Sequence, residues 1–208
     1  MDGYRILSLN KQTIQKINEN YGEDFLKNIL SEFSCPLNKD LEKFLHNSAL
    51  VFANQGVAQT HLVFTSYKNN PVLCGYFTLT NKHFTIKKNF DISNSLKKRM
   101  NKFATYDSNL KTYVISAPLI AQLGKNYTNQ YNKLITGDEL LKIACEMVKD
   151  IQGIIGGRIV YLECEDKPKL TEFYESNGFI NFGRRNLDAD EKDDLSGEYL
   201  IQLLKYLK

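Results

Sequence analysis

The segment from Lys133 to Gly137 has the residue types that can hold a phosphate at the start of a helix. Leu140 and Leu141 begin a helical repeat, so Thr136 stands where the helix should start. The first turn of a helix presents unbonded N–H groups and the positive end of its dipole, which stabilise an anion. Gly137 would let a ligand come close to the backbone, and Lys133 would add positive charge. The alternative is an ordinary helix start, with Thr136 serving only as its N-cap.

Regular elements are expected on both sides of this segment. Residues 113–123 read as a long strand, in which Pro118 fits only at a bulge or irregularity. A helix is expected over residues 136–152, because its apolar positions follow the helical period. Further elements are expected in this order: a buried strand at 158–164, a short helix at 167–177 closed by Gly178, a strand at 179–182 and a last strand at 199–204, after an acidic loop at 188–194.

The N-terminal part also reads as alternating strands and helices. A strand at 4–9 precedes a helical stretch at 11–30 that breaks at Gly22, and Asn38 is the expected N-cap of a helix that fades at 54–56. Residues 61–67 and 72–79 form a hairpin pattern joined by turn residues. The least regular stretch, 81–109, should hold a short strand near 84–86 and a helix near 95–103.

Composition narrows the class of protein. The chain has 208 residues, 42% of them hydrophobic and 25% charged, which is typical of one globular domain. Its net charge of +3 is spread along the chain and does not choose between phosphate-bearing partners. The four cysteines have no metal-ligand spacing, so no metal site is expected. No apolar run suits a signal peptide or a membrane span, and a reduced, cytoplasmic protein is expected.

Two motifs resemble those of a known family. Tyr131–Leu141 resembles the pyrophosphate loop of the GNAT N-acetyltransferases, Q/R-x-x-G-x-G/A followed by a helix, and Phe173–Phe179 resembles their F-Y-x-x-x-G-F signature. The segments that resemble the N-terminal half of one GNAT branch are Phe33–Cys35, Leu41–Ala49, Gln59–Phe64 and Gly75–Leu79. That branch includes the toxins that acetylate aminoacyl-tRNA. The resemblance covers most of residues 33–182.

The resemblance implies a fold and an activity. The fold would be the α/β GNAT fold, a mixed sheet of about six to seven strands flanked by helices. Residues 1–208 would form a single domain, with 81–109 as a less typical insertion. The protein would be an N-acetyltransferase that uses acetyl-CoA as co-substrate and a primary amine as acceptor. The toxin branch would add aminoacyl-tRNA as the acceptor and an antitoxin-like partner, and the chain could form a homodimer.

The resemblance also assigns roles to single residues. Asn132, Lys133, Leu134, Ile135, Thr136 and Gly137 would hold the diphosphate of coenzyme A. The N–H of Leu123 or Gly124 would polarise the thioester carbonyl, and Tyr174 would protonate the departing thiolate as general acid. The alternative for Tyr174 is plain packing of its short helix. The general base stays open among Glu163, His61, His83 and water.

The pyrophosphate motif departs from the family pattern in two places. Ile135 stands where the first glycine belongs, and Asn132 is the amide residue at the position where the motif opens with Gln or Arg, with Gln130 and Lys133 as near substitutes. The departures leave three outcomes: an altered loop, looser cofactor binding or a catalytically weak relative. The competing functions are therefore an inactive acyl-CoA-binding module and a nucleic-acid-binding protein. The basic run Lys87, Lys88, Lys97, Lys98, Arg99 and Lys102 would either contact RNA phosphates or simply face water.

Overall fold

The structure is a computed structural model that describes residues 3–87, 93–189 and 197–207. The chain divides into two compact units, which we call the first unit (residues 1–80 and 121–144) and the second unit (residues 81–120 and 145–208). Three elements, β3, β5 and α6, have residues in both units. The expectation of a single domain over 1–208 stays a prediction.

The first unit begins with a strand and a set of helices. β1 (Tyr4–Leu9) is followed by α1 (Lys11–Tyr21) and α2 (Asp24–Ser31), which are separated at Gly22 as predicted. Asn38 caps α3 (Lys39–Lys43), because its side-chain oxygen accepts the Asp40 N–H at 2.9 Å. One π-helical turn (Phe44–Ser48) leads into α4 (Ala49–Gln55), which ends at the left-handed Gly56.

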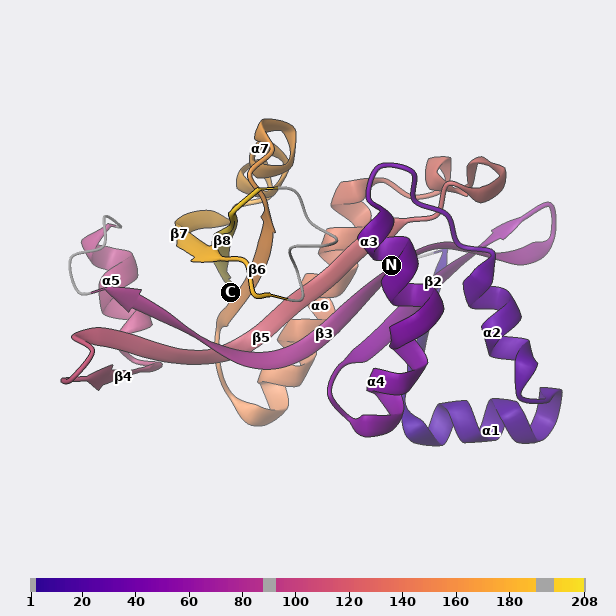
Figure 1. The fold of residues 1–208 in the computed structure, drawn as a ribbon, viewed down its shortest axis with the longest axis horizontal. Coiled ribbons are helices and arrows are strands. Elements are labelled where there is room, and N and C mark those ends of the chain that lie inside the picture. The colour runs from indigo at the N-terminus through magenta and orange to yellow at the C-terminus, as the bar shows by residue number, and fades with distance from the viewer. Residues whose placement is uncertain (1–2, 88–92, 190–196, 208) are drawn as a thin grey trace. The chain divides into compact units, whose positions relative to one another are not determined.

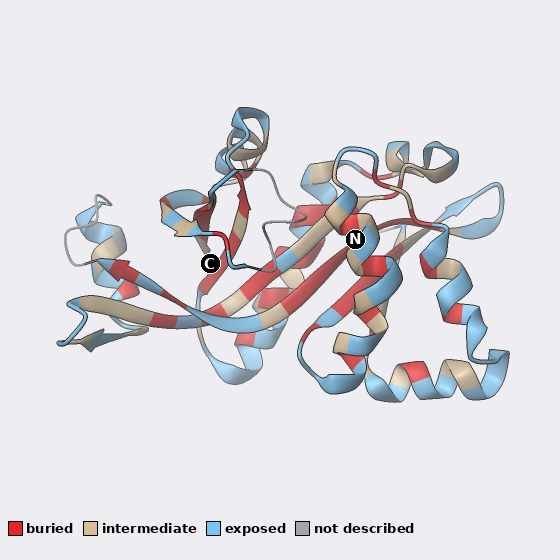
Figure 2. Ribbon diagram, viewed as in Figure 1, coloured by how far each residue is buried: buried red, intermediate tan, exposed pale blue. Residues whose placement is uncertain are grey.

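The sheet of the first unit has the order β1-β2-β3-β5, with antiparallel β1–β2 and β2–β3 pairs. β2 (Gln59–Tyr67) and β3 (Asn70–Lys87) form the predicted hairpin, and the turn residues Lys68 and Asn69 have φ of 50° and 64°. β5 spans Thr112–Lys125. Helices cover the sheet, and α4 packs on β2. Figure 2 shows buried residues along β2 and β3, whereas α1 and α2 are mostly exposed.

The second unit is built on the remaining strands. β4 (Ala104–Asp107) pairs with β5, and β5 lies parallel to β6 (Ile159–Glu165). β8 (Tyr199–Tyr206) lies between β6 and β7 (Ile180–Asn186), antiparallel to both. Of the helices labelled in Figure 1, α5 (Asn94–Met100) and α7 (Pro168–Ser176) belong to this unit, together with the part of α6 (Gly137–Ile155) that follows residue 144. The aromatic centre of the core is Phe84, whose ring contacts those of Tyr161 and Phe182.

The element order agrees with the sequence analysis, with three differences. The described residues contain eight strands, one more than the upper expectation. The strand expected at 84–86 is the end of the long β3, and β4 was not predicted. α6 runs through Gly153 to Ile155, because a single exposed glycine weakens a helix without ending it. The acidic loop expected at 188–194 lies largely outside the described residues.

Candidate functional site

The start of α6 is closed by a capping box formed by Thr136 and Glu139. The Glu139 carboxylate oxygen Oε2 accepts both the N–H and the hydroxyl of Thr136, each at 2.8 Å. In return, the Thr136 hydroxyl oxygen accepts the Glu139 N–H at 3.1 Å. The N–H and hydroxyl of Thr136 hold the pKa of Glu139 below its ordinary value. Thr136 therefore makes the N-cap contacts of the alternative interpretation, and its role as a ligand of the diphosphate stays a prediction.

Other donors at the same helix start are available to a ligand. Within the described residues, the N–H groups of Ile135 and Gly137 have no hydrogen-bond acceptor. The Ile135 side chain is buried, and its φ is not positive. Replacing the family's glycine with isoleucine therefore needs no left-handed backbone here, and the side chain points into the core. Two free amides at a helix start are the groups that a diphosphate needs.

The residues before Ile135 are less strongly fixed. The Lys133 ammonium is exposed and donates to the Gln130 side-chain oxygen at 2.6 Å, while Asn132 is half-buried. The Leu134 carbonyl accepts the hydroxyl of Tyr4 at 3.1 Å, which ties the loop to the first residue of β1. The Lys133 side chain sits on a short 3-10 segment (Thr128–Lys133), in which Asn129 and Gln130 have φ of 49° and 62°.

Asn126, which sequence reasoning missed, holds the chain just before this loop. The Asn126 amide Nδ2 donates to the Leu73 carbonyl at 2.9 Å, and its Oδ1 accepts the N–H groups of Ser34 and Thr128, each at 3.1 Å. The Asn126 N–H also donates to the Cys74 carbonyl at 2.9 Å. This buried side chain makes three hydrogen bonds, two of them to segments that are distant in sequence. No local pattern could have identified it.

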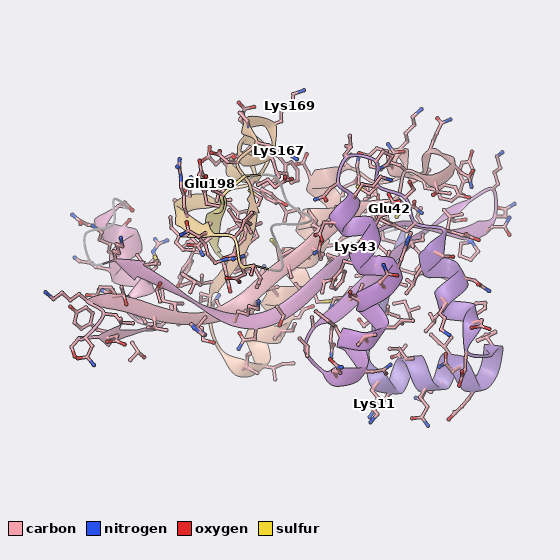
Figure 3. All side chains as sticks on the ribbon, in the orientation of Figure 1. Lys11, Glu42, Lys43, Lys167, Lys169 and Glu198 are labelled. Carbon is pink, nitrogen blue, oxygen red and sulfur yellow. The ribbon has the colours of Figure 1, made fainter. Side chains whose placement is uncertain are left out.

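The network continues into α3. The Glu42 carboxylate, labelled in Figure 3, accepts the Cys35 N–H at 2.7 Å. The N–H of Cys35 and, more weakly, the ammonium of Lys39 hold the pKa of Glu42 below its ordinary value. The turn at 34–35 is thus fixed both by Asn126 and by α3.

The end of β5 carries the two residues predicted to face the thioester. Leu123 is half-buried and Gly124 is buried. A Cβ atom at Gly124 would lie 2.8 Å from a methyl carbon of Leu41, and a Cβ at Gly75 would lie 2.9 Å from the Gly124 carbonyl oxygen. Gly75 is therefore required by close packing against backbone, whereas the contact at Gly124 is with the end of a flexible side chain. The role of the Leu123 or Gly124 N–H stays a prediction.

Tyr174 belongs to the second unit, where it lies on α7. Its side chain is 8% exposed, and its ring contacts those of Phe173 and Phe179 edge-on. Within the described residues, its hydroxyl makes no hydrogen bond. Burial raises the pKa of this phenol above its ordinary value, with a smaller contribution from Cys164. Gly178, at φ of 81°, ends the helix as predicted.

The structure narrows the candidates for a general base. The Glu163 carboxylate accepts two N–H groups of Arg185, at 2.8 and 2.9 Å, and the Gln202 amide at 2.8 Å. Both Arg185 donors bond to the carboxylate oxygen Oε2 and Gln202 bonds to Oε1, so both oxygens of this carboxylate are engaged. His61 is buried against Phe77 and bonded to the Ser8 hydroxyl at 2.8 Å, and burial lowers its pKa to about 4. His83 is exposed on β3.

The basic run is only partly described, because Lys88 lies outside the described residues. Lys98, Arg99 and Lys102 are exposed at the end of α5, and the Arg99 guanidinium lies 5.3 Å from the ring centre of Tyr206. In the described ranges, no group of three or more His, Cys, Asp or Glu side chains is arranged to hold a metal ion. None of the described helices is long and apolar enough to cross a membrane.

The predicted residues fall into two groups. The first unit contains Leu123, Gly124 and the loop 132–137, and the second unit contains Tyr174. Sequence reasoning also missed Glu139, although the Thr-x-x-Glu spacing of a capping box was visible in the sequence.

We compared the chain with protein-family models, curated protein sequences and solved structures, and only solved structures match. No protein-family model matches the chain. No curated protein sequence matches it either. Among solved structures, a tyrosine-to-phenylalanine mutant of KacT matches with a TM-score of 0.60 at 14% identity, over 97% of this chain and 94% of that chain.

Two structures of AtaT match similarly. One is a tyrosine-to-phenylalanine mutant toxin bound to the C-terminus of the antitoxin AtaR and acetyl-CoA, with a TM-score of 0.57, 16% identity and coverage of 99% and 94%. The other is AtaT complexed with acetyl-methionyl-tRNAfMet, with a TM-score of 0.58, 16% identity and coverage of 95% and 93%. These likenesses confirm the predicted GNAT fold.

Proposed function

We propose that this protein is a GNAT-type N-acetyltransferase that moves an acetyl group from acetyl-CoA to a primary amine, with the amino group of aminoacyl-tRNA as the acceptor. The observation that carries the proposal is the likeness of nearly the whole chain to AtaT, which has been solved with acetyl-CoA and with acetyl-methionyl-tRNAfMet. The two motifs of the sequence analysis add support, because both lie on elements suited to their roles.

The start of α6 would hold the diphosphate. The amides of Ile135 and Gly137 lack acceptors within the described residues, and Lys133 brings an exposed cation to the same loop. Asn126 holds the preceding backbone in place, so these donors are positioned before a ligand arrives. The residues present therefore fit a diphosphate.

Acetyl-CoA supplies an acetyl group that is activated as a thioester. The N–H of Leu123 or Gly124 would polarise its carbonyl, which is typically worth about 3 kcal/mol of barrier. Tyr174 keeps its proton at neutral pH, because burial raises the pKa of its phenol. A protonated hydroxyl with no partner in the described residues can donate to a departing thiolate.

Proton removal from the amine is assigned to water. Glu163 is held by Arg185, and the pKa of His61 is lowered by burial in a fully packed strand. The exposed cations Lys98, Arg99 and Lys102 would contact tRNA phosphates. An antitoxin-like protein is the proposed partner, by analogy with AtaT bound to AtaR and with the KacTA–DNA complex. Because aminoacyl-tRNA is a cytoplasmic substrate, the proposed reaction would take place in the cytoplasm.

The test is to incubate the purified protein with acetyl-CoA and either aminoacyl-tRNA or deacylated tRNA. Thiol release and N-acetylated aminoacyl-tRNA are expected only with the charged tRNA. Binding of coenzyme A by calorimetry, without thiol release across a panel of amines, would instead support the inactive acyl-CoA-binding module. Absence of any coenzyme A binding would overturn the proposal.

A further inference from the structure

The carboxylate of Glu139 occupies the place of an anion at the start of α6. One of its oxygens accepts the N–H and the hydroxyl of Thr136, both at 2.8 Å. The two flanking donors, the amides of Ile135 and Gly137, stay open within the described residues. At the helix start, the Thr136 amide is therefore bound to the Glu139 carboxylate, while the amides on either side of it are free to bind a ligand.

An external diphosphate and this carboxylate need the same donor. A backbone N–H makes one strong hydrogen bond, so the Thr136 amide cannot serve both ligands at full strength. The two anions would also repel each other at hydrogen-bonding distance. Glu139 is exposed, and apart from Thr136 its carboxylate also interacts with the Tyr4 hydroxyl, so both contacts must be released before the side chain rotates into solvent.

We propose that Glu139 is an internal competitor of the coenzyme A diphosphate, so that the cofactor binds only when the Thr136–Glu139 capping box opens. This inference rests on the proposed function. Opening the box exchanges one capping interaction for binding of the ligand. The protein therefore has a lower affinity for coenzyme A than its loop would otherwise allow.

The expected change in coenzyme A affinity depends on two quantities, the strength of the capping interaction and the charge at the helix start. Each typically changes an equilibrium by roughly five- to tenfold. Glu139→Gln removes the charge and keeps a side chain that can still cap. Glu139→Ala removes both. We expect the dissociation constant for coenzyme A to fall about fivefold in Glu139→Gln and about tenfold or more in Glu139→Ala.

The experiment measures binding by calorimetry and the melting temperature of each variant. Asp138→Asn is the matched control, because it removes the same charge from the neighbouring residue of the same turn. Pantetheine, which lacks the diphosphate, is the control ligand, and its affinity should not change. Glu139→Ala should also melt at a lower temperature than the wild type, because its helix loses a cap.

Three results would overturn the inference. If the wild type binds coenzyme A and Glu139→Gln and Glu139→Ala bind it no better, Glu139 is not a competitor, and the proposed function stands. If Asp138→Asn gains as much affinity as Glu139→Gln, any negative charge in this turn weakens coenzyme A binding, and competition for the Thr136 amide is not the cause. Failure of coenzyme A to bind to any of these proteins would overturn both this inference and the proposed function.

Discussion

The two segments that carry the proposed reaction are held in opposite ways. Residues 126–139 of the first unit are fixed by polar contacts, centred on the buried Asn126 and on the Thr136–Glu139 box. Tyr174 of the second unit is fixed by aromatic contacts, and its hydroxyl has no partner within the described residues. In the first segment the same groups serve folding and the proposed binding, whereas in the second the hydroxyl of the proposed general acid makes no hydrogen bond that holds the fold.

The comparison predicts its largest effect at Tyr174. Tyr174→Phe should lower the acetylation rate by about 10²- to 10⁴-fold, because the proton donor is lost. Its unfolding free energy should change by less than about 0.5 kcal/mol, because no hydrogen bond is broken. Acetylation kinetics and urea unfolding measure the two effects. Tyr199→Phe, which removes a hydroxyl bonded to Asp166, is the control and should keep full activity.

A large loss of stability in Tyr174→Phe would show that the hydroxyl helps to hold the fold, which contradicts the contrast between the two segments. An unchanged rate with normal coenzyme A binding would remove Tyr174 from the mechanism and leave the fold assignment intact.

Asn126 should show the reverse behaviour. Asn126→Ala should lose about 3 kcal/mol of unfolding free energy, because three hydrogen bonds of a buried side chain break and their partners are left unsatisfied. Coenzyme A affinity should fall as well, since the loop loses its anchor. Asn20→Ala, at an exposed position on α1, should change stability by less than about 0.5 kcal/mol. A stable Asn126→Ala with intact binding would show that the polar network does not position the loop.

The buried side chain of His61 should make the stability of the protein depend on pH. Burial lowers its pKa to about 4, whereas in the unfolded chain it has the ordinary value near 6.5. The unfolded state therefore binds more protons between these values, and stability must fall as the pH drops through this window. At pH 5 the loss should be about 2 kcal/mol.

Urea unfolding at pH 7.5 and pH 5 measures this loss. The His61→Gln variant should lack this part of the pH dependence, whereas His83→Gln, at an exposed position, should retain it. Equal slopes for the wild type and His61→Gln would mean that His61 does not cause the loss.

The smallest effects are expected at two glycines. Gly75→Ala should lose about 1–2 kcal/mol, because its Cβ would lie 2.9 Å from the Gly124 carbonyl oxygen. Gly153→Ala should gain about 0.5–1 kcal/mol, since nothing lies within 4 Å of its Cβ and alanine favours a helix. Thermal unfolding of both variants checks the signs. A neutral Gly75→Ala would show that β3 and β5 can separate slightly.

Much of the fold was predictable from short-range patterns. Gly22, Asn38 and Gly178 mark helix ends as expected, and the β2–β3 hairpin has the predicted turn. The failures have a common cause. The apolar pattern of the sequence predicts a strand that ends at residue 79, because the residues that follow are mostly polar. In the structure the same strand, β3, continues to Lys87. β4 was missed because its four residues alternate too briefly to show a period.

By itself, the sequence determined the helix start at Thr136, because a residue and its partner three positions later meet whenever the chain becomes helical. Only the tertiary structure decided that Glu163 is bound to Arg185 and Gln202, and that Asn126 reaches Ser34. Those partners are 22, 39 and 92 positions apart. Contacts at such separations depend on which strands become neighbours, and no local spacing encodes that choice.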